Sequence, residues 1–439
     1  MNFFPEIERQ SLAEIKAYQS VRLQELLAYV SQNSPYYREL FRREKIDISK
    51  IKTVDDLPQI PTCGKVDLFT HNDAFICVPR SEIRDYVTTS GTSGDPVTFA
   101  LTENDLERLA YNEAISFSCA GARAGDVFQL MTTLDKRFMA GLAYFLGIRK
   151  LSAGIIRVGN GIPELQWESI ARFKPTTLIC VPSFIVKLVE YAERNGIDYK
   201  HSSVKKAVCI GENLREQDFS LNLLGQRIKS MWDIELYSTY ASTEMASTFT
   251  ECACGQGGHH HPELLIVELL DEQGQPVPEG EVGELTVSTL GVEAMPLLRF
   301  RTGDLCRFHH EPCACGRNTL RISPIVGRLN QMIKVKGTTL YPPVVFDILD
   351  HIEAVKNYVV EISSSDLGTD VLKIFVDCPQ IYEGIEKDLK DKFRAKLRIA
   401  PELCLLTTEE ILQMQKVNER RKPIKFIDNR RNDYGCTSI

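Results

Sequence analysis

The sequence has no uninterrupted apolar segment long enough to cross a bilayer. Its first residues, "MNFFPEIERQ", lack the basic region and apolar run of a secretion signal, so we expect a cytoplasmic protein without a membrane partner. Basic residues are not in excess either: 52 lysines and arginines stand against 59 aspartates and glutamates, a net charge of −7. Because nucleic-acid affinity depends on neutralising phosphates, this balance argues against a nucleic-acid partner.

The length and composition are those of a globular enzyme. A chain of 439 residues is too long for one simple core and predicts two or three domains. Hydrophobic residues make up 43% and charged residues 25% of the chain, which is not the balance of a disordered protein. The 13 cysteines are partly grouped in Cys-x-Cys pairs, and we expect reduced thiols and a metal site rather than disulfides.

Apolar, β-branched runs alternate with helical patterns in the first half of the chain. We expect buried strands at residues 126–133, 154–159, 176–183 and 205–212, and helices between or after them at 164–173, 184–196 and 214–225. Further helices are expected at 20–34 and at 102–122, the second capped by Thr102. This alternation predicts an α/β fold with a mostly parallel sheet covered by helices on both faces.

The pattern changes from about residue 264. Residues 264–290 read as two strands joined by turn residues. A last segment has strands at 357–365 and 371–378 and a charged helix at 382–397, which together predict a small α+β domain. We therefore divide the chain into a domain of residues 1–329 and a domain of residues 330–439.

The stretch "TTSGTSGDP", residues 88–96, is crowded with glycines and hydroxyls. Glycines let backbone N–H groups turn toward one point, so such a loop suits phosphate oxygens. It is not a Walker loop, because Gly94 is followed by Asp95 and Pro96 instead of lysine and serine or threonine. Taken alone, a loop of this composition is more often a surface turn.

Five segments, in order over more than three hundred residues, resemble the motifs of the adenylate-forming enzymes. They are "TSGTSGDP" (89–96, phosphate loop), "YASTE" (240–244), "RFRTGDL" (299–305), "GRLNQMIKVKG" (327–337, hinge) and "RKPIKFIDNR" (421–430, terminal lysine motif). Within that superfamily the chain resembles the phenylacetate-CoA ligases over nearly its whole length. The segments that carry this likeness are "LLAYVSQNSPYYRELF", "IKTVDDLPQIP", "CIGENL" and "CACGR".

The resemblance implies a large adenylate-forming N-terminal domain with a β-rich subdomain, and a small mobile C-terminal lid. It implies that an aryl acid such as phenylacetate reacts with ATP to give an acyl-adenylate and pyrophosphate. Coenzyme A then displaces AMP to form the thioester. A homodimer and a requirement for Mg²⁺ are implied in the same way.

The resemblance also implies the nucleotide site. The residues that would cradle the β- and γ-phosphates are Ser90, Gly91, Thr92, Ser93 and Gly94. Thr243 would reach the α-phosphate, and Glu244 would hold Mg²⁺, which prefers carboxylate oxygens. Tyr240 would offer its ring to the adenine, and the residues that would line the nucleotide with it are Gly211, Glu212, Ala241 and Ser242. Asp304 would accept from the ribose hydroxyls, with Arg321 as a further donor. Outside the family context, Tyr240 is more often a core aromatic and Asp304 a turn residue.

Lys422 would place a cation between the attacking carboxylate and the α-phosphate. The small domain would then swing about Asn330 and carry this lysine away before the thiol arrives. The sequence departs from the family pattern at Asp95, where a basic residue is common, and at Arg421, where a glycine is common. Lys425 remains a rival for the catalytic role, and without the family motif a solvated basic tail would be the favoured interpretation of this segment.

The clustered cysteines indicate a second site. "ECACGQGGHHH" (251–261) and "PCACGR" (312–317) supply two Cys-x-Cys pairs and a histidine run, which can close a tetrahedral zinc site. The resemblance favours the ligands Cys252, His259, Cys313 and Cys315, with Cys254 as the rival of His259. Such a zinc would hold two distant loops together and be structural. Unligated thiols are the alternative.

Two other functions remain to be compared with the ligase. A zinc-dependent nucleic-acid module would explain the cysteines, but a pI of about 5.8 argues against it. An adenylating enzyme that passes its acyl group to a carrier protein or an amine would share the same motifs. The acyl pocket is expected near Phe138, Met139, Tyr144 and Phe145, which suit a flat apolar acid but also suit a helix core.

Overall fold

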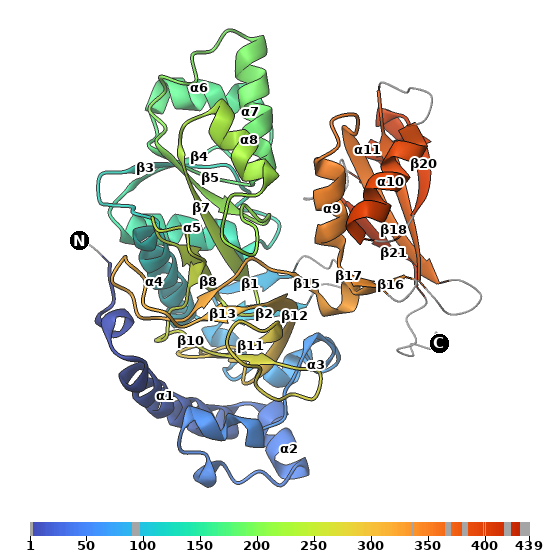
Figure 1. Ribbon diagram of the computed structural model, residues 1–439. Coiled ribbons are helices and arrows are strands. Elements are labelled where there is room, and N and C mark those ends of the chain that lie inside the picture. The colour runs from blue at the N-terminus through green and yellow to red at the C-terminus, as the bar shows by residue number, and fades with distance from the viewer. Residues whose placement is uncertain are drawn as a thin grey trace. The chain divides into compact units, whose positions relative to one another are not determined.

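The computed structural model describes residues 3–89, 97–335, 338–364, 370–379, 385–397, 399, 401–416 and 423–430. The chain divides into two compact units, Met1–Ile325 and Val326–Ile439 (Figure 1). Among the helices of these described residues, none combines the length and apolar character that a bilayer crossing requires.

The first unit begins with helices. They are η1 (Glu6–Arg9), α1 (Leu12–Asn33), α2 (Pro35–Arg43), η2 (Ile48–Lys50), η3 (Val54–Gln59), α3 (Lys65–Thr70), η4 (Asn72–Phe75) and η5 (Arg80–Glu82). Helix α1 starts at a capping box, in which Ser11 and Glu14 each accept a hydrogen bond from the other's backbone N–H. Its buried face carries Leu23, Leu27 and Val30, and the helix includes nearly all of the segment predicted at residues 20–34.

A nine-stranded mixed sheet forms the centre of this unit. From edge to edge its strands are β13 (Phe308–His309), β14 (Arg321–Ile322), β9 (Gly258–His259), β8 (Ser247–Glu251), β7 (Glu235–Ser242), β6 (Lys206–Ile210), β5 (Thr177–Cys180), β3 (Val127–Leu130) and β4 (Gly154–Arg157). The strands from β4 to β7 run parallel, and those from β7 to β13 run antiparallel. All four strands predicted between residues 126 and 212 are present.

Helices cover both faces of the parallel strands, as predicted (Figure 1). They are α4 (Glu103–Cys119) and α5 (Met139–Lys150) on one face, and α6 (Pro163–Phe173), α7 (Pro182–Arg194) and α8 (Leu223–Met231) on the other. Side chains alternate along each strand: Leu178 packs with α6 to α8, whereas Ile179 packs with α4 and α5. Thr102 caps α4 through a capping box with Asp105, also as predicted.

The helix predicted at 214–225 is wrong over most of its length, because α8 begins only at Leu223. The preceding residues fold into a turn in which Arg215 pairs with Leu221. Asp218 accepts hydrogen bonds from the backbone N–H and the hydroxyl of Ser220. Such local side-chain bonds compete with helix formation, and the apolar spacing alone does not reveal them.

Two smaller sheets complete the first unit. Strands β1 (Asp85–Thr88) and β2 (Thr98–Leu101) pair antiparallel, as do β10 (Leu265–Leu270), β11 (Gly283–Thr289) and β12 (Phe300–Cys306). The two strands expected within 264–290 are therefore β10 and β11. Both sheets and helices α1 and α2 share one core, which includes Leu27, Phe99 and Phe300.

The second unit is a small α+β fold, as predicted. Its elements are β15 (Gly327–Arg328), η6 (Leu329–Gln331), β16 (Ile333–Val335), β17 (Thr338–Leu340), α9 (Pro342–Asp350), β18 (Asn357–Ser364), β19 (Asp370–Asp377), α10 (Ile385–Leu397), β20 (Glu402–Leu406), α11 (Thr408–Met414) and β21 (Phe426–Asp428). The four-stranded sheet has the order β20-β19-β18-β21. Its core contains Val360, Ile374 and Phe393.

Candidate functional site

The carboxyl ends of β5, β6 and β7 bring several predicted nucleotide residues together. Gly211 follows β6 with a φ of +78°, a backbone conformation that favours glycine. Glu212 accepts hydrogen bonds from the backbone N–H and the hydroxyl of Ser183, both at 3.0 Å, at the start of α7. Ile210 lies opposite Thr239 in the sheet, so the Gly211 and Tyr240 positions are neighbours. Ligands of open α/β sheets bind at such strand ends.

Tyr240 and Asp304 are in direct contact. The hydroxyl of Tyr240, on β7, donates to Oδ2 of Asp304, on β12, at 2.6 Å. Burial and the neighbouring Asp304 carboxylate raise the pKa of Tyr240 well above its usual range, so the phenol stays neutral and donates. The hydrogen bond fixes the orientation of a carboxylate that is only 6% exposed.

The turn after β7 carries the rest of the "YASTE" motif. Ser242 accepts from the Met245 N–H at 3.3 Å, and the Thr243 carbonyl accepts from Ala246 N–H at the same distance. Ala241 is exposed, Ser242 and Thr243 are half-buried, and Glu244 is 8% exposed. The turn therefore offers a hydroxyl and a carboxylate at the end of the strand.

Lys65 is a residue that the sequence analysis missed. Its ammonium, at the first position of α3, lies 3.7 Å from Oε1 of Glu244. Asp67 fixes the start of this helix by accepting from the Gly64 N–H at 2.8 Å. A buried carboxylate requires a compensating charge, and Lys65 supplies it from a side chain that is 43% exposed. The departure at Asp95, which removes an expected cation, was the sequence signal that could have prompted a search for another one.

Several predicted residues lie outside the described residues. These are the loop residues Ser90, Gly91, Thr92, Ser93 and Gly94, the neighbouring Asp95, and Arg421 and Lys422. The ends of the loop are described: the Thr89 N–H donates to the Val97 carbonyl, and the Val97 N–H donates to the Thr89 hydroxyl, each at 3.0 Å. The backbone of Asn330 lies in η6, and its side chain is also outside the described part.

The side chains of Lys425 and Arg321 both contact neighbouring protein groups. The Lys425 ammonium lies 4.9 Å from the ring centroid of Tyr358 and 3.4 Å from its hydroxyl. Arg321, on β14, is buried and donates from its two Nη atoms to the carbonyls of Gln256 and Glu311, at 2.5 and 3.0 Å. Its role as a ribose donor stays a prediction.

The residues expected at the acyl pocket differ in burial. Tyr144 is buried in the core, with its ring centroid 5.9 Å from that of Phe117, which is the helix-core alternative. Met139 is buried as well, whereas Phe145 is half-buried beneath the guanidinium of Arg157, 5.6 Å from the ring centroid.

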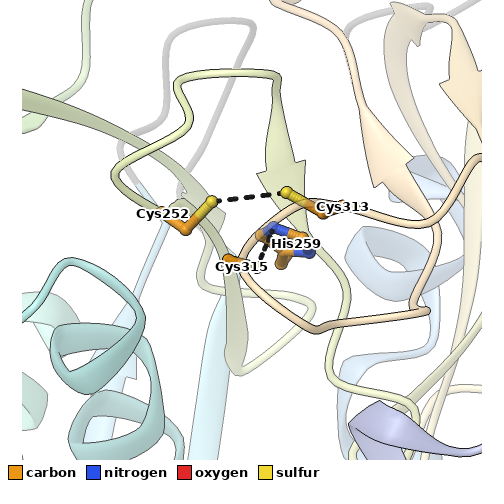
Figure 2. A group of neighbouring side chains, drawn as sticks. All are labelled: Cys252, His259, Cys313 and Cys315. Carbon is orange, nitrogen blue, oxygen red and sulfur yellow. Dashed lines mark hydrogen bonds between the residues drawn. The ribbon is translucent and has the colours of Figure 1, made fainter.

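Four potential metal ligands converge from two distant loops (Figure 2). Cys252 follows β8, His259 lies on β9, and Cys313 and Cys315 lie between β13 and β14. Their ligand atoms all lie within 4.8 Å of one another. The sulfurs of Cys252 and Cys313 are 3.6 Å apart, and Cys315 Sγ is 3.5 Å from His259 Nε2. Cys254 is half-buried and is not one of the four.

This donor set fits a tetrahedral zinc ion. Ligands about 2.3 Å from such an ion lie about 3.8 Å from one another, close to the separations found here. The hydrogen bond from Cys252 lowers the pKa of Cys315, and the same pairing, together with burial, raises the pKa of Cys252. Burial lowers the pKa of His259, so its imidazole is neutral. A neutral imidazole and a thiolate are the forms that bind metals.

Outer groups orient two of the ligands. Thr319 Oγ1 lies 3.2 Å from Nδ1 of His259, which leaves Nε2 facing the sulfurs. A guanidinium nitrogen of Arg317 lies 3.7 Å from Cys315 Sγ. Such partners are typical of a metal site, since they fix ligand direction and increase affinity.

Known proteins agree with this architecture. The family described as AMP-binding enzyme matches residues 77–294. A phenylacetate-coenzyme A ligase of Thermus thermophilus is 32% identical over 399 residues, which cover 89% of this chain and 88% of that protein. The Escherichia coli enzyme of the same name is 28% identical over 347 residues, or 76% of each chain.

Solved structures support the fold. A 2-hydroxyisobutyryl-CoA ligase in the postadenylation state aligns with a TM-score of 0.83 and 22% identity, covering 97% of this chain and 92% of that chain. The predicted α/β fold and the predicted superfamily are both confirmed. Because the similarity to the Thermus ligase extends over most of both sequences, the chain belongs to the phenylacetate-coenzyme A ligase family of AMP-binding enzymes.

Proposed function

We propose that the protein is an ATP-dependent carboxylate–CoA ligase. It joins an aryl acid, phenylacetate or a similar arylacetate, to ATP, forming an acyl-adenylate and releasing pyrophosphate. The thiol of coenzyme A then attacks the acyl carbon, and AMP leaves as the thioester forms. The observation that carries this proposal is the Tyr240–Asp304 contact beside Glu244, in a chain of this family.

The nucleotide would be held by the strand ends. The Asp304 carboxylate, oriented by Tyr240, accepts from ribose hydroxyls, and Arg321 is assigned as a further donor. Tyr240 presents its ring to the adenine, and the residues that line the base and the α-phosphate with it are Gly211, Glu212, Ala241, Ser242 and Thr243. The loop residues Ser90, Gly91, Thr92, Ser93 and Gly94 would hold the outer phosphates.

Two kinds of positive charge are assigned to the adenylation step. Glu244 would hold Mg²⁺, which neutralises phosphate charge when bound. Lys65 supplies an ammonium 3.7 Å from Oε1 of Glu244 and can compensate for the cation missing at Asp95. Lys422 remains our proposed catalytic lysine of the C-terminal unit, because Lys425 is already engaged by Tyr358.

The proposal includes a structural zinc held by Cys252, His259, Cys313 and Cys315. The ion would join two loops that are distant in sequence, since Cys252 and Cys313 are 61 residues apart. We further propose that residues 1–329 form the adenylate-forming domain and that residues 330–439 act as a lid hinged at Asn330. The family resemblance also favours a cytoplasmic homodimer.

Carboxylate-dependent ATP–pyrophosphate exchange tests the first half-reaction. Phenylacetate, indoleacetate, benzoate and a short alkyl acid are compared, and coenzyme A is then added to the active mixtures. We expect exchange and thioester formation with an arylacetate, both sharply reduced by Glu244→Gln. Glu25→Gln is the matched control, since Glu25 is exposed and forms an ion pair with nearby Arg22 on the same helix.

Two outcomes would change the proposal. Exchange without thioester formation would favour the second candidate, an enzyme that passes the acyl group to a carrier protein or an amine. Absence of exchange with every acid would refute adenylation of this substrate class.

A further inference from the structure

The side chain of Glu8, on η1, is completely buried although it carries a carboxylate. Its two oxygens have separate partners. Oε1 lies 2.6 Å from Nδ1 of His261, and Oε2 accepts from Nε of Arg317 at 2.6 Å. A carboxylate this deep in the protein is tolerated only when it is paired in this way, and removing one partner is strongly destabilising.

The partners of Glu8 belong to the two loops that carry the four cysteine and histidine ligands. His261 is two residues after His259, and Arg317 is two residues after Cys315. Arg317 also contacts one of the proposed metal ligands directly, since its Nη1 lies 3.7 Å from Cys315 Sγ. One guanidinium therefore connects the Glu8 carboxylate with a metal-binding sulfur.

Other contacts fasten the same N-terminal segment to the second loop. The Asn318 N–H donates to the Glu8 carbonyl, and the Asn318 amide donates to the Arg9 carbonyl, each at 2.8 Å. The ring of Phe4 receives two guanidinium groups, from Arg9 and Arg317, each 4.0 Å from its centroid. The segment thus contacts this loop through backbone, side-chain and ring interactions.

The first loop is tied back into the sheet through His261. Its Nε2 lies 3.0 Å from the hydroxyl of Ser116, on α4, and Ser116 in turn contacts Thr248, on β8. His261 is completely buried and Ser116 is 1% exposed. Ser116, His261 and Glu8 are hydrogen-bonded in the order of a hydrolase triad. Because all three are buried, no substrate can reach the serine, and we assign the row the role of positioning the first loop.

We infer that residues 3–10 form the outer wall of the metal centre, and that metal binding and attachment of this segment stabilise each other through Glu8, Arg317 and Cys315. The inference rests on the proposed zinc centre. A bound ion fixes the Cys313–Cys315 loop and so holds Arg317 in place for Glu8. Conversely, Glu8 holds Arg317 against the sulfur, and by linkage the two effects have equal free energy.

The test begins with metal content. Purified full-length protein, before and after addition of one equivalent of Zn²⁺, is assayed by elemental analysis, and Co²⁺ substitution reports thiolate ligation by its charge-transfer absorption. One tightly bound ion with thiolate bands supports the centre. Absence of a bound ion under both conditions would overturn the centre and the coupling together.

The coupling has its own measurement. Zinc release to a chromophoric chelator is timed for wild type, for Glu8→Gln and for the control Glu6→Gln, an exposed residue of the same short helix. We expect release to be about 10 to 100 times faster in Glu8→Gln only, the effect typical of an outer partner of a metal ligand. Equal release rates in a zinc-loaded Glu8→Gln would overturn the coupling and leave the zinc centre standing.

A second measurement requires no substitution. Hydrogen exchange of the peptide covering residues 3–11 is compared between the zinc-loaded and zinc-free wild-type protein. We expect faster exchange without zinc, while peptides of α7 remain unchanged. Unchanged exchange at residues 3–11 would contradict the coupling even if Glu8→Gln failed to fold.

Discussion

The hydroxyl of Tyr240 donates to the carboxylate of Asp304 at 2.6 Å and so joins two sheets through residues 64 positions apart. Both residues are contributed by motifs of the adenylate-forming family. In the proposed nucleotide site this contact would give the ribose a rigid acceptor, because the neutral phenol of Tyr240 orients the Asp304 carboxylate and leaves its negative charge in place.

Tyr240→Phe removes this donor while keeping the ring. We expect the KM for ATP to rise by about 10-fold, because a hydrogen bond to a charged group contributes roughly 1.5 to 3 kcal/mol. Pyrophosphate exchange at varied ATP concentration measures the effect. Tyr237→Phe is the control, since this tyrosine lies on the same strand but donates to Glu235 at 2.7 Å. Equal effects of the two substitutions would contradict the assignment.

Lys65→Met removes the ammonium beside Glu244. We expect pyrophosphate exchange to fall by about 100-fold, the size typical of losing one positioned charge in an active site. Thioester formation from added acyl-adenylate should change little, since no pyrophosphate leaves in that step. Lys65→Arg should restore part of the exchange activity. Lys50→Met, which removes an exposed lysine 4.0 Å from Asp47, is the control.

The ligand set of the metal centre is tested by two single substitutions. We expect His259→Ala to lose zinc and to lower the melting temperature by several degrees. In the wild type the proposed ion joins two loops, and this link is lost in the variant. Cys254→Ser should keep both the zinc and the melting temperature, since Cys254 is outside the four-residue group. Elemental analysis and calorimetry measure the two properties, and the reverse pattern would exchange the roles of these residues.

Glu113 gives the protein a pH-dependent stability. Burial in α4 raises its pKa from 4.5 to about 8, even though Asn112 donates to its carboxylate. The unfolded chain therefore loses this proton near pH 4.5 and the folded chain only near pH 8, so stability falls as the pH rises between these values. In Glu113→Gln this decline should become shallower, because burial also raises the pKa of Glu251 and of Glu263, which still contribute to it. Thermal melts from pH 5 to 8 would measure the difference.

The control for this pH effect lies on the same helix. The Lys150 ammonium, 2.9 Å from Glu107, lowers the pKa of this exposed carboxyl, so Glu107→Gln should keep the wild-type decline between pH 5 and 8. A decline of unchanged size in Glu113→Gln would contradict the assignment to Glu113.

Much of the fold was predictable because local patterns carry it. Strands β5 and β6 are nearly continuous apolar runs, as strands buried on both faces must be, whereas β4 at the sheet edge is only partly buried. The helix at 214–225 failed because Asp218 and Ser220 bond locally, which apolar spacing does not register. The small C-terminal unit was recognised from alternating strands and one charged helix.

Site residues could be proposed from the sequence only where a motif names them. Glu244 and Asp304 stand in recognisable motifs, whereas Lys65 lies in an ordinary helix start and meets Glu244 only through tertiary folding. Glu8 is 309 residues from Arg317, and no local pattern marks either as a partner of the other. Contacts of this kind arise from the packing of distant segments and leave no period or spacing in the chain.

The change of strand direction at β7 also bears on how the chain folds. Neighbours on its parallel side, such as β6, return only after long crossovers, whereas β8 follows β7 through a short turn. Short closures form faster than long ones, so we expect the β7–β8 hairpin to form early and to offer β6 an edge on which to assemble. The strand that bears the nucleotide motif would then also be the seed from which the parallel half of the sheet grows.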